Sequence, residues 1–141
     1  MTIISIDFSI LYPGVCICKD FKDYKWIAVV NTNNRKKDKK NLENLVLEYP
    51  SIRIEYTESR RVKSNSYHIT ERNKLFNYLE STSLLIKLLE EEIDLNDDIL
   101  VVIEGISFGS KGNALVDISQ ATGIIKNKLV DSILKGDTDR F

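Results

Sequence analysis

The stretch Val101–Gly123, with the sequence VVIEGISFGSKGNALVDISQATG, decides the fold of this chain. It opens within a short apolar run, Ile99–Ile103, which is typical of a strand buried on both faces. The run ends in a carboxylate, Glu104, and is followed by a glycine-punctuated turn and then a helical pattern. In open α/β sheets, ligands bind at the carboxyl ends of the strands. A carboxylate there costs free energy unless a cation meets it, so the stretch predicts a charged site at the end of a sheet.

The N-terminus repeats this design. The first expected strand, Thr2–Phe8, carries a β-branched, apolar run that leads directly into Asp7. Two buried strands that each deliver one carboxylate, Asp7 and Glu104, predict a site for a divalent metal ion. Carboxylates that lie close together repel one another unless cations neutralise them.

Composition describes a single globular domain. The chain has 141 residues, of which 43% are hydrophobic and 29% charged, enough to bury a core without disulfides. Its formal net charge of -1 means that a nucleic-acid partner has to be inferred from local charge. Cys16 and Cys18 are poorly spaced for a mutual disulfide, and we expect them to be small buried hydrophobes in a reducing compartment. No apolar run reaches membrane-spanning length and no signal peptide begins the chain, so we expect a soluble, cytoplasmic protein.

Three strands and two long helices account for most of the remaining pattern. Thr2–Phe8, Val15–Lys19 and Tyr24–Asn31 have short connections, which predict an antiparallel meander. Helical patterns over Ile69–Ile93 and about 113–135 flank the Glu104 strand. Their expected core side is formed by apolar residues at three- and four-residue steps: Leu75, Leu79, Ile86, Leu89, Ile93, Leu115, Ile118, Ile125, Leu129 and Ile133.

Two further details of the helices can be predicted. Gly123 stands inside the second helix, where glycine costs roughly 1 kcal/mol relative to alanine, so we expect it to pack closely against the sheet. The first helix ends in three acidic residues, Glu90–Glu92, which oppose the helix dipole and predict a solvated face.

A polar insertion at about 32–66 separates the third strand from the first long helix. The run 31–40, NTNNRKKDKK, has no apolar residue, and it is either a solvated loop or an arm that holds phosphates. A short helix is expected over Leu42–Tyr49 and an edge strand over Ile52–Tyr56. The candidates for phosphate contacts in this insertion are Arg35, Lys36, Lys37, Arg60 and Arg61.

The order strand, strand, strand, insertion, helix, strand, helix is how the ribonuclease H-like fold begins. Ile6–Ser9 followed by Pro13–Ile17 resembles the first motif of the RuvC-like Holliday-junction resolvases, and Val102–Gly105 with Ser119–Gly123 resembles the second. The turn Phe108–Gly112 is similar to that of resolvase-like proteins of bacteriophages and large DNA viruses. The resemblance implies an α/β fold with a ribonuclease H-like mixed sheet whose C-terminal part is missing.

The resemblance also implies an activity. It indicates a structure-selective endonuclease that cleaves branched DNA, with Asp7 and Glu104 as catalytic ligands of Mg²⁺ and with Mn²⁺ as a substitute metal. It implies a homodimer, because a four-way junction needs two symmetric cuts. The turn after Glu104 would then contact the DNA backbone and bases, although Phe108 is equally consistent with a core aromatic. The implied DNA contacts in this turn are Ser107, Phe108, Ser110 and Lys111.

One departure from the family keeps other functions open. The family carries a further aspartate motif on a last helix, whereas this sequence ends at Phe141, with Asp139 as the candidate for a third metal ligand. The chain is expected to be a nuclease or the N-terminal portion of one, or else a catalytically inactive ribonuclease H-like module that binds nucleic acid or protein. A third alternative is an actin-like ATPase fragment. The bulky Ile10–Tyr12 turn argues against it, because turns that cradle phosphates favour small residues.

Overall fold

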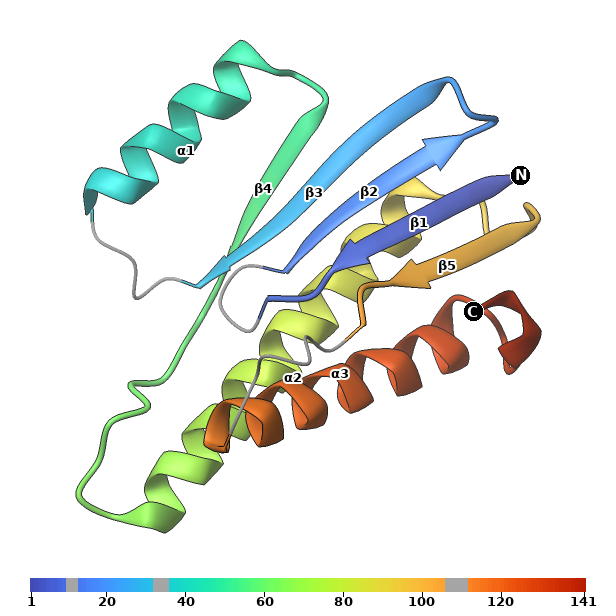
Figure 1. Ribbon diagram of the computed structural model, residues 1–141. Coiled ribbons are helices and arrows are strands. Elements are labelled where there is room, and N and C mark those ends of the chain that lie inside the picture. Colours follow the sequence, from blue (N-terminus) through green and yellow to red (C-terminus); the bar gives the residue numbers. More distant parts are fainter. Residues whose placement is uncertain (10–12, 32–35, 106–111) are drawn as a thin grey trace.

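The computed structural model describes residues 1–9, 13–31, 36–105 and 112–141, with the side chains of 36–38 excepted. These residues form one five-stranded mixed sheet and three α-helices (Figure 1), so the predicted α/β class is confirmed. The elements are β1 (Thr2–Asp7), β2 (Gly14–Lys19), β3 (Asp23–Asn31), α1 (Lys36–Glu48), β4 (Ile52–Thr57), α2 (Tyr67–Glu92), β5 (Ile99–Ile103), α3 (Asn113–Ser132) and the 3₁₀ helix η1 (Thr138–Arg140).

The strand order in the sheet is β4-β3-β2-β1-β5. β2 is antiparallel to both β1 and β3, which confirms the predicted meander. β5 runs parallel to β1, and β4 runs parallel to β3. Because β1 and β3 both oppose β2, four of the five strands share one direction. Their last residues therefore meet at one end of the sheet, which we call the carboxyl end.

Helices α2 and α3 cover one face of the sheet (Figure 1). Side chains alternate along a strand, so every second residue of β1, β2, β3 and β5 enters the core between this face and the two helices. The largest fully buried side chains of this core include Ile4, Val15, Val29, Leu85, Leu88, Leu89, Ile99, Val101, Ile125 and Leu129. We call this side of the sheet the helix face.

The expectation of a continuous core stripe along both helices is wrong at their N-terminal ends. Leu75, Leu79 and Leu115 are exposed. At this level the buried residues of α2 are Asn77, Tyr78, Ser81 and Thr82, so Leu75 and Leu79 lie outside its buried face. The helix is also long, since its 26 residues extend for about 39 Å, whereas a strand of six residues spans about 20 Å. The N-terminal part of α2 therefore projects past the sheet. Gly123 is also exposed, so its predicted close packing on the sheet is wrong.

The insertion extends the sheet at the β3 side. β4 is the predicted edge strand, and it is reached through α1. Residues 36–40 belong to this helix, which corrects the expectation of a loop through Lys40. Lysine is a good helix former, and Lys39 lies 4.0 Å from Glu43 one turn later. The Lys39 ammonium lies 5.3 Å from the centre of the Tyr56 ring on β4. Arg53 and Tyr56 are three residues apart on β4, so their side chains project from opposite faces of the sheet. Arg53 contacts α2, and α1, which contacts Tyr56, therefore lies over the face opposite α2.

Candidate functional site

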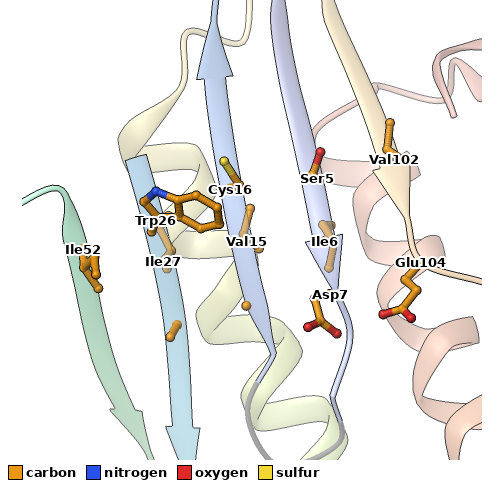
Figure 2. A pocket seen from close by; sticks show the side chains of 12 residues that line it. Ser5, Ile6, Asp7, Val15, Cys16, Trp26, Ile27, Ile52, Val102 and Glu104 are labelled. Carbon is orange, nitrogen blue, oxygen red and sulfur yellow. The ribbon is translucent and has the colours of Figure 1, made fainter. Parts of the chain in front are cut away.

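The face of the sheet opposite α2 and α3 is largely uncovered, and we call it the open face. Its residues align in cross-strand rows, as the registers of all four strand pairs show. One row crosses the whole sheet from β4 to β5 and consists of Ile52, Trp26, Cys16, Ser5 and Val102 (Figure 2). The next row toward the carboxyl end begins with Ile54, Ala28, Gly14 and Asp7.

Glu104 completes this second row. Its backbone N–H donates to the carbonyl oxygen of Ile6 at 3.1 Å, which continues the parallel β1–β5 pairing one residue beyond β5. Glu104 and Asp7 therefore stand at the same level on neighbouring strands, which lie about 4.8 Å apart. Both side chains project from the open face (Figure 2) and both are exposed. The two carboxylates that the sequence singled out are brought together.

The carboxylates have no cationic neighbour in the described part of the chain. Neither Asp7 nor Glu104 forms an ion pair with any described residue. Other acidic side chains of this protein are paired, such as Asp117 with Lys74 at 3.0 Å. Among the described residues, the pair at the carboxyl end is thus a local concentration of negative charge without an ion-pair partner.

A hollow of about 730 Å³ lies beside the pair on the open face. Space for the hollow is left by Gly14 and Ala28, which share the row with Asp7 and have almost no side chain. Trp26 borders the hollow on the far side, and its indole extends toward β2 (Figure 2). Burial, and after it the neighbouring Cys18, raises the pKa of the Cys16 thiol, which lines the hollow.

The donor set fits a hydrated divalent cation. Mg²⁺ keeps several water ligands and is commonly bound by one or two carboxylates together with oxygens of a phosphate. Asp7 and Glu104 supply two such carboxylates, on rigid strands and open to solvent. Within the described ranges, no group of three or more histidine, cysteine, aspartate or glutamate side chains is placed to hold a metal ion.

Asp139 does not belong to this pair. It lies in η1, where its N–H donates to the Asp137 carboxylate at 3.0 Å. Asp137 borders a second hollow, of about 660 Å³, together with Asp97 and Asp98, the residues that precede β5. The C-terminus accordingly lies near the start of β5 (Figure 1), at the end of the sheet remote from Asp7. The prediction of Asp139 as a third ligand beside the two carboxylates is therefore wrong for this structure.

Several predicted DNA contacts cannot be placed. Ser107, Phe108, Ser110, Lys111 and Arg35 lie outside the described residues. Lys36 and Lys37 begin α1, and their side chains also lie outside the described part.

Arg60 and Arg61 are held on the segment that leaves the carboxyl end of β4. The Arg60 N–H donates to Oδ1 of Asn77 at 2.7 Å, and Nδ2 of Asn77 donates back to the Arg60 carbonyl at 3.0 Å. Nδ2 of Asn73 donates to the Arg61 carbonyl at 2.9 Å. The Arg60 guanidinium stacks 3.7 Å from the centre of the Phe76 ring. One face of α2 thus fixes this segment, and both arginines remain exposed.

The role of Asn73, Asn77 and Trp26 was not foreseen from the sequence. The two amides give no signal, because their partners lie 12 and 17 residues away. Trp26 did give one. Along β3 the residues Ile27 and Val29 have the parity of a buried face, so an aromatic at position 26 belongs to the other face.

Comparisons with protein-family models, with curated proteins and with solved structures found nothing that matches this chain. Among the described residues, none of the helices combines the length and the apolar character that crossing a membrane requires.

Proposed function

We propose that this chain is a Mg²⁺-dependent, structure-selective endonuclease of ribonuclease H-like architecture that cleaves branched DNA. One observation carries the proposal. Asp7 and Glu104 end neighbouring parallel strands at the same level, project from the same face and lack a cationic partner among the described residues. The meander followed by a parallel strand beside β1 agrees with the expected beginning of that fold.

The two carboxylates act as ligands that orient the reacting phosphate. Asp7 and Glu104 would hold Mg²⁺, and the bound ion would supply activation of a water molecule and stabilisation of the charge that develops on a DNA phosphate. Asp7 and Glu104 hold their oxygens on strands whose backbones are hydrogen-bonded, so the site is preorganised. Their exposure leaves room for water molecules and for a phosphate from the substrate.

The arginine segment supports a polyanionic substrate. Arg60 and Arg61 follow β4 at the same end of the sheet, and their segment is held against α2 on the helix side. Their exposed guanidinium groups are candidates for contacts to DNA phosphates away from the phosphate at the carboxylates. A four-way junction requires two symmetric cuts, so the proposal includes a homodimer.

Cleavage of a labelled four-way junction in Mg²⁺ or Mn²⁺ tests the proposal. We expect metal-dependent cutting that falls at least 100-fold in Asp7→Asn and in Glu104→Gln, because each change removes a ligand from a two-carboxylate site. Asp139→Asn is the matched control and should cut like the parent chain, because Asp139 lies at the other end of the sheet. Cutting that survives in both ligand variants would contradict the proposal.

A second candidate function is binding without cutting. It is favoured by the number of ligands, since the described residues supply two carboxylates and no third histidine, cysteine, aspartate or glutamate placed to share a metal ion with them. Junction binding that needs no divalent metal, is unchanged by Asp7→Asn and is followed by no cleavage would identify the chain as a binding module.

A further inference from the structure

Trp26 is an exposed aromatic side chain on an inner strand of the sheet. It lies on β3, with Ile52 of β4 on one side and Cys16 of β2 on the other. Despite two neighbouring strands, 50% of its surface is exposed. Val102, at the β5 end of the same row, is 49% exposed. A large apolar surface that is left open beside a charged site usually marks a binding surface.

A second copy of the chain is a poor occupant for this surface. A stable dimer buries about 800 Å² of accessible surface on each partner, so its interface would extend beyond Trp26 and Val102 to the carboxylates beside the hollow. An apolar protein surface laid over the hollow would also cover Asp7 and Glu104, which lack cationic partners among the described residues. Burying unpaired carboxylates is costly.

An unpaired nucleobase fits both the shape and the charge. A base is flat and stacks on an aromatic ring, with Trp26 open on the side of the hollow. The phosphate attached to that base arrives with a divalent cation, so Asp7 and Glu104 are neutralised rather than buried alone. Gly14 and Ala28, in the same row as Asp7, have almost no side chain and so leave space between the indole and the carboxylates.

The spacing connects the indole to the carboxylates. Trp26 and Asp7 lie two strands and one cross-strand row apart, about 12 Å between their Cα atoms. The indole extends from β3 toward β2, which shortens the gap (Figure 2). A base next to the phosphate held at the carboxylates is therefore within reach of the ring.

We propose that Trp26 is a stacking platform for an unpaired base of the DNA strand whose phosphate is held at Asp7 and Glu104. This inference rests on the proposed function and adds the origin of structure selectivity. A base inside a duplex is stacked on its neighbours and cannot lie on the sheet, whereas a base at a branch point or in a single strand can. Trp26 thereby favours DNA with unpaired nucleotides.

Fluorescence tests this directly, because Trp26 is the only tryptophan of the chain. The full chain is titrated in Mg²⁺ with a single-stranded thymidine octamer that carries a terminal dye. Tryptophan emission reports stacking, and dye polarisation reports binding. We expect saturable quenching of the emission by at least half, with the same midpoint as the polarisation change. Binding seen by polarisation with unchanged emission would overturn the inference, and so would an emission change that follows protein concentration without DNA.

Matched variants separate stacking from folding. Trp26→Leu should weaken octamer binding roughly 5- to 150-fold, because one stacked base contributes that much. Trp26→Phe should retain binding within a few-fold, since phenylalanine keeps an aromatic face. Tyr24→Leu is the control, because Tyr24 shares the strand and the face, is 51% exposed and lies one row farther from the carboxylates. Equal losses in Tyr24→Leu and Trp26→Leu would refute a specific platform. Urea unfolding confirms that each variant is folded.

The two proposals fail in different ways. Junction cleavage that depends on Asp7, together with octamer binding that leaves Trp26 emission unchanged, would overturn the platform and leave the nuclease. Quenching and Trp26-dependent binding, without cleavage in Mg²⁺ or Mn²⁺, would support the platform and overturn the nuclease.

Discussion

The sequence context of Gly123 suggested that glycine is needed there for close packing, whereas the structure indicates that alanine would make the protein more stable. A methyl group added at Gly123 would meet no other side chain within 4 Å among the described residues. Glycine inside a helix costs conformational entropy, so Gly123→Ala should raise the free energy of unfolding by about 1 kcal/mol. Urea denaturation measures this. The control is Gly136→Ala, which should destabilise the protein because Gly136 has a φ of +88°. A stability of Gly123→Ala below that of the parent chain would contradict the prediction.

Glu92 makes stability depend on pH. Its carboxylate lies 2.7 Å from Lys25 and 3.0 Å from Arg53. The ion pair with Lys25, followed by that with Arg53, lowers the pKa of Glu92 from its ordinary value of 4.5. A depressed carboxyl pKa stabilises the fold above the unfolded-state value, and this stabilisation is lost as the pH falls through the folded-state value.

Glu92→Gln should therefore cost about 1 kcal/mol at pH 7, the upper range for a partly exposed ion pair. At pH 3 the difference from the parent chain should shrink. Urea unfolding at the two pH values measures both numbers, and Glu90→Gln is the control because Glu90 is exposed and forms no ion pair among the described residues. A cost that is the same at pH 3 as at pH 7 would refute the assignment.

The hairpin between β2 and β3 carries strain at the scale of an element. The Lys22 N–H donates to the Lys19 carbonyl at 3.0 Å, and the two central residues, Asp20 and Phe21, have φ values of 50° and 58°. These values define a type I′ turn, which favours glycine at its second central position. Phe21 is 66% exposed, so its side chain contributes little packing there.

Phe21→Gly should therefore stabilise the chain by about 1 kcal/mol, since glycine adopts positive φ at no steric cost. The midpoint of thermal unfolding measures the effect. Lys22→Gly is the matched control and should lower stability, because Lys22 lacks a positive φ. If Phe21→Gly unfolds at a lower temperature than the parent chain, the strain argument is wrong.

Elements that depend on local pattern could be predicted from the sequence, whereas long-range pairing could not. Apolar runs ending in Asp7 and Glu104 predicted both strands and the end of the sheet where they meet. The acidic Glu90–Glu92 was expected to be a solvated face, but Glu91 and Glu92 pair with Arg53, which is about 40 residues earlier in the chain. Periodicity reports which face of an element is apolar, but not which distant side chain faces it.

At the scale of the whole molecule, the two faces of the sheet have different roles. The helix face provides the core, with α2 and α3 packed on β1, β2, β3 and β5. The open face carries the two carboxylates, the hollow and Trp26. Stability and the proposed chemistry are thus largely separated. Substitutions at the carboxylates should change metal binding without removing core contacts.

Metal-linked stability tests this separation without relying on activity. A ligand that binds only the folded state stabilises it by RT ln(1 + [L]/Kd), which is about 1.4 kcal/mol at ten times Kd. We expect Mg²⁺ to raise the unfolding temperature of the parent chain, and NaCl of equal ionic strength to leave it nearly unchanged. Asp7→Asn and Glu104→Gln should lose the Mg²⁺ shift, while Asp139→Asn should keep it.

In EDTA the same two variants should be as stable as the parent chain, or more stable by a few tenths of a kcal/mol. Like charges facing each other on neighbouring strands are unfavourable, and each variant removes one of them. A carboxylate retained for structure behaves differently, because Asp117 pairs with Lys74 across α2 and α3 and its removal should destabilise the chain with or without metal. If Asp7→Asn lost stability in EDTA as Asp117→Asn does, Asp7 would be part of the structural framework. A gain, combined with the lost Mg²⁺ shift, would identify the pair as a site held at the expense of stability, whereas no change with that loss would identify a metal site without a structural role.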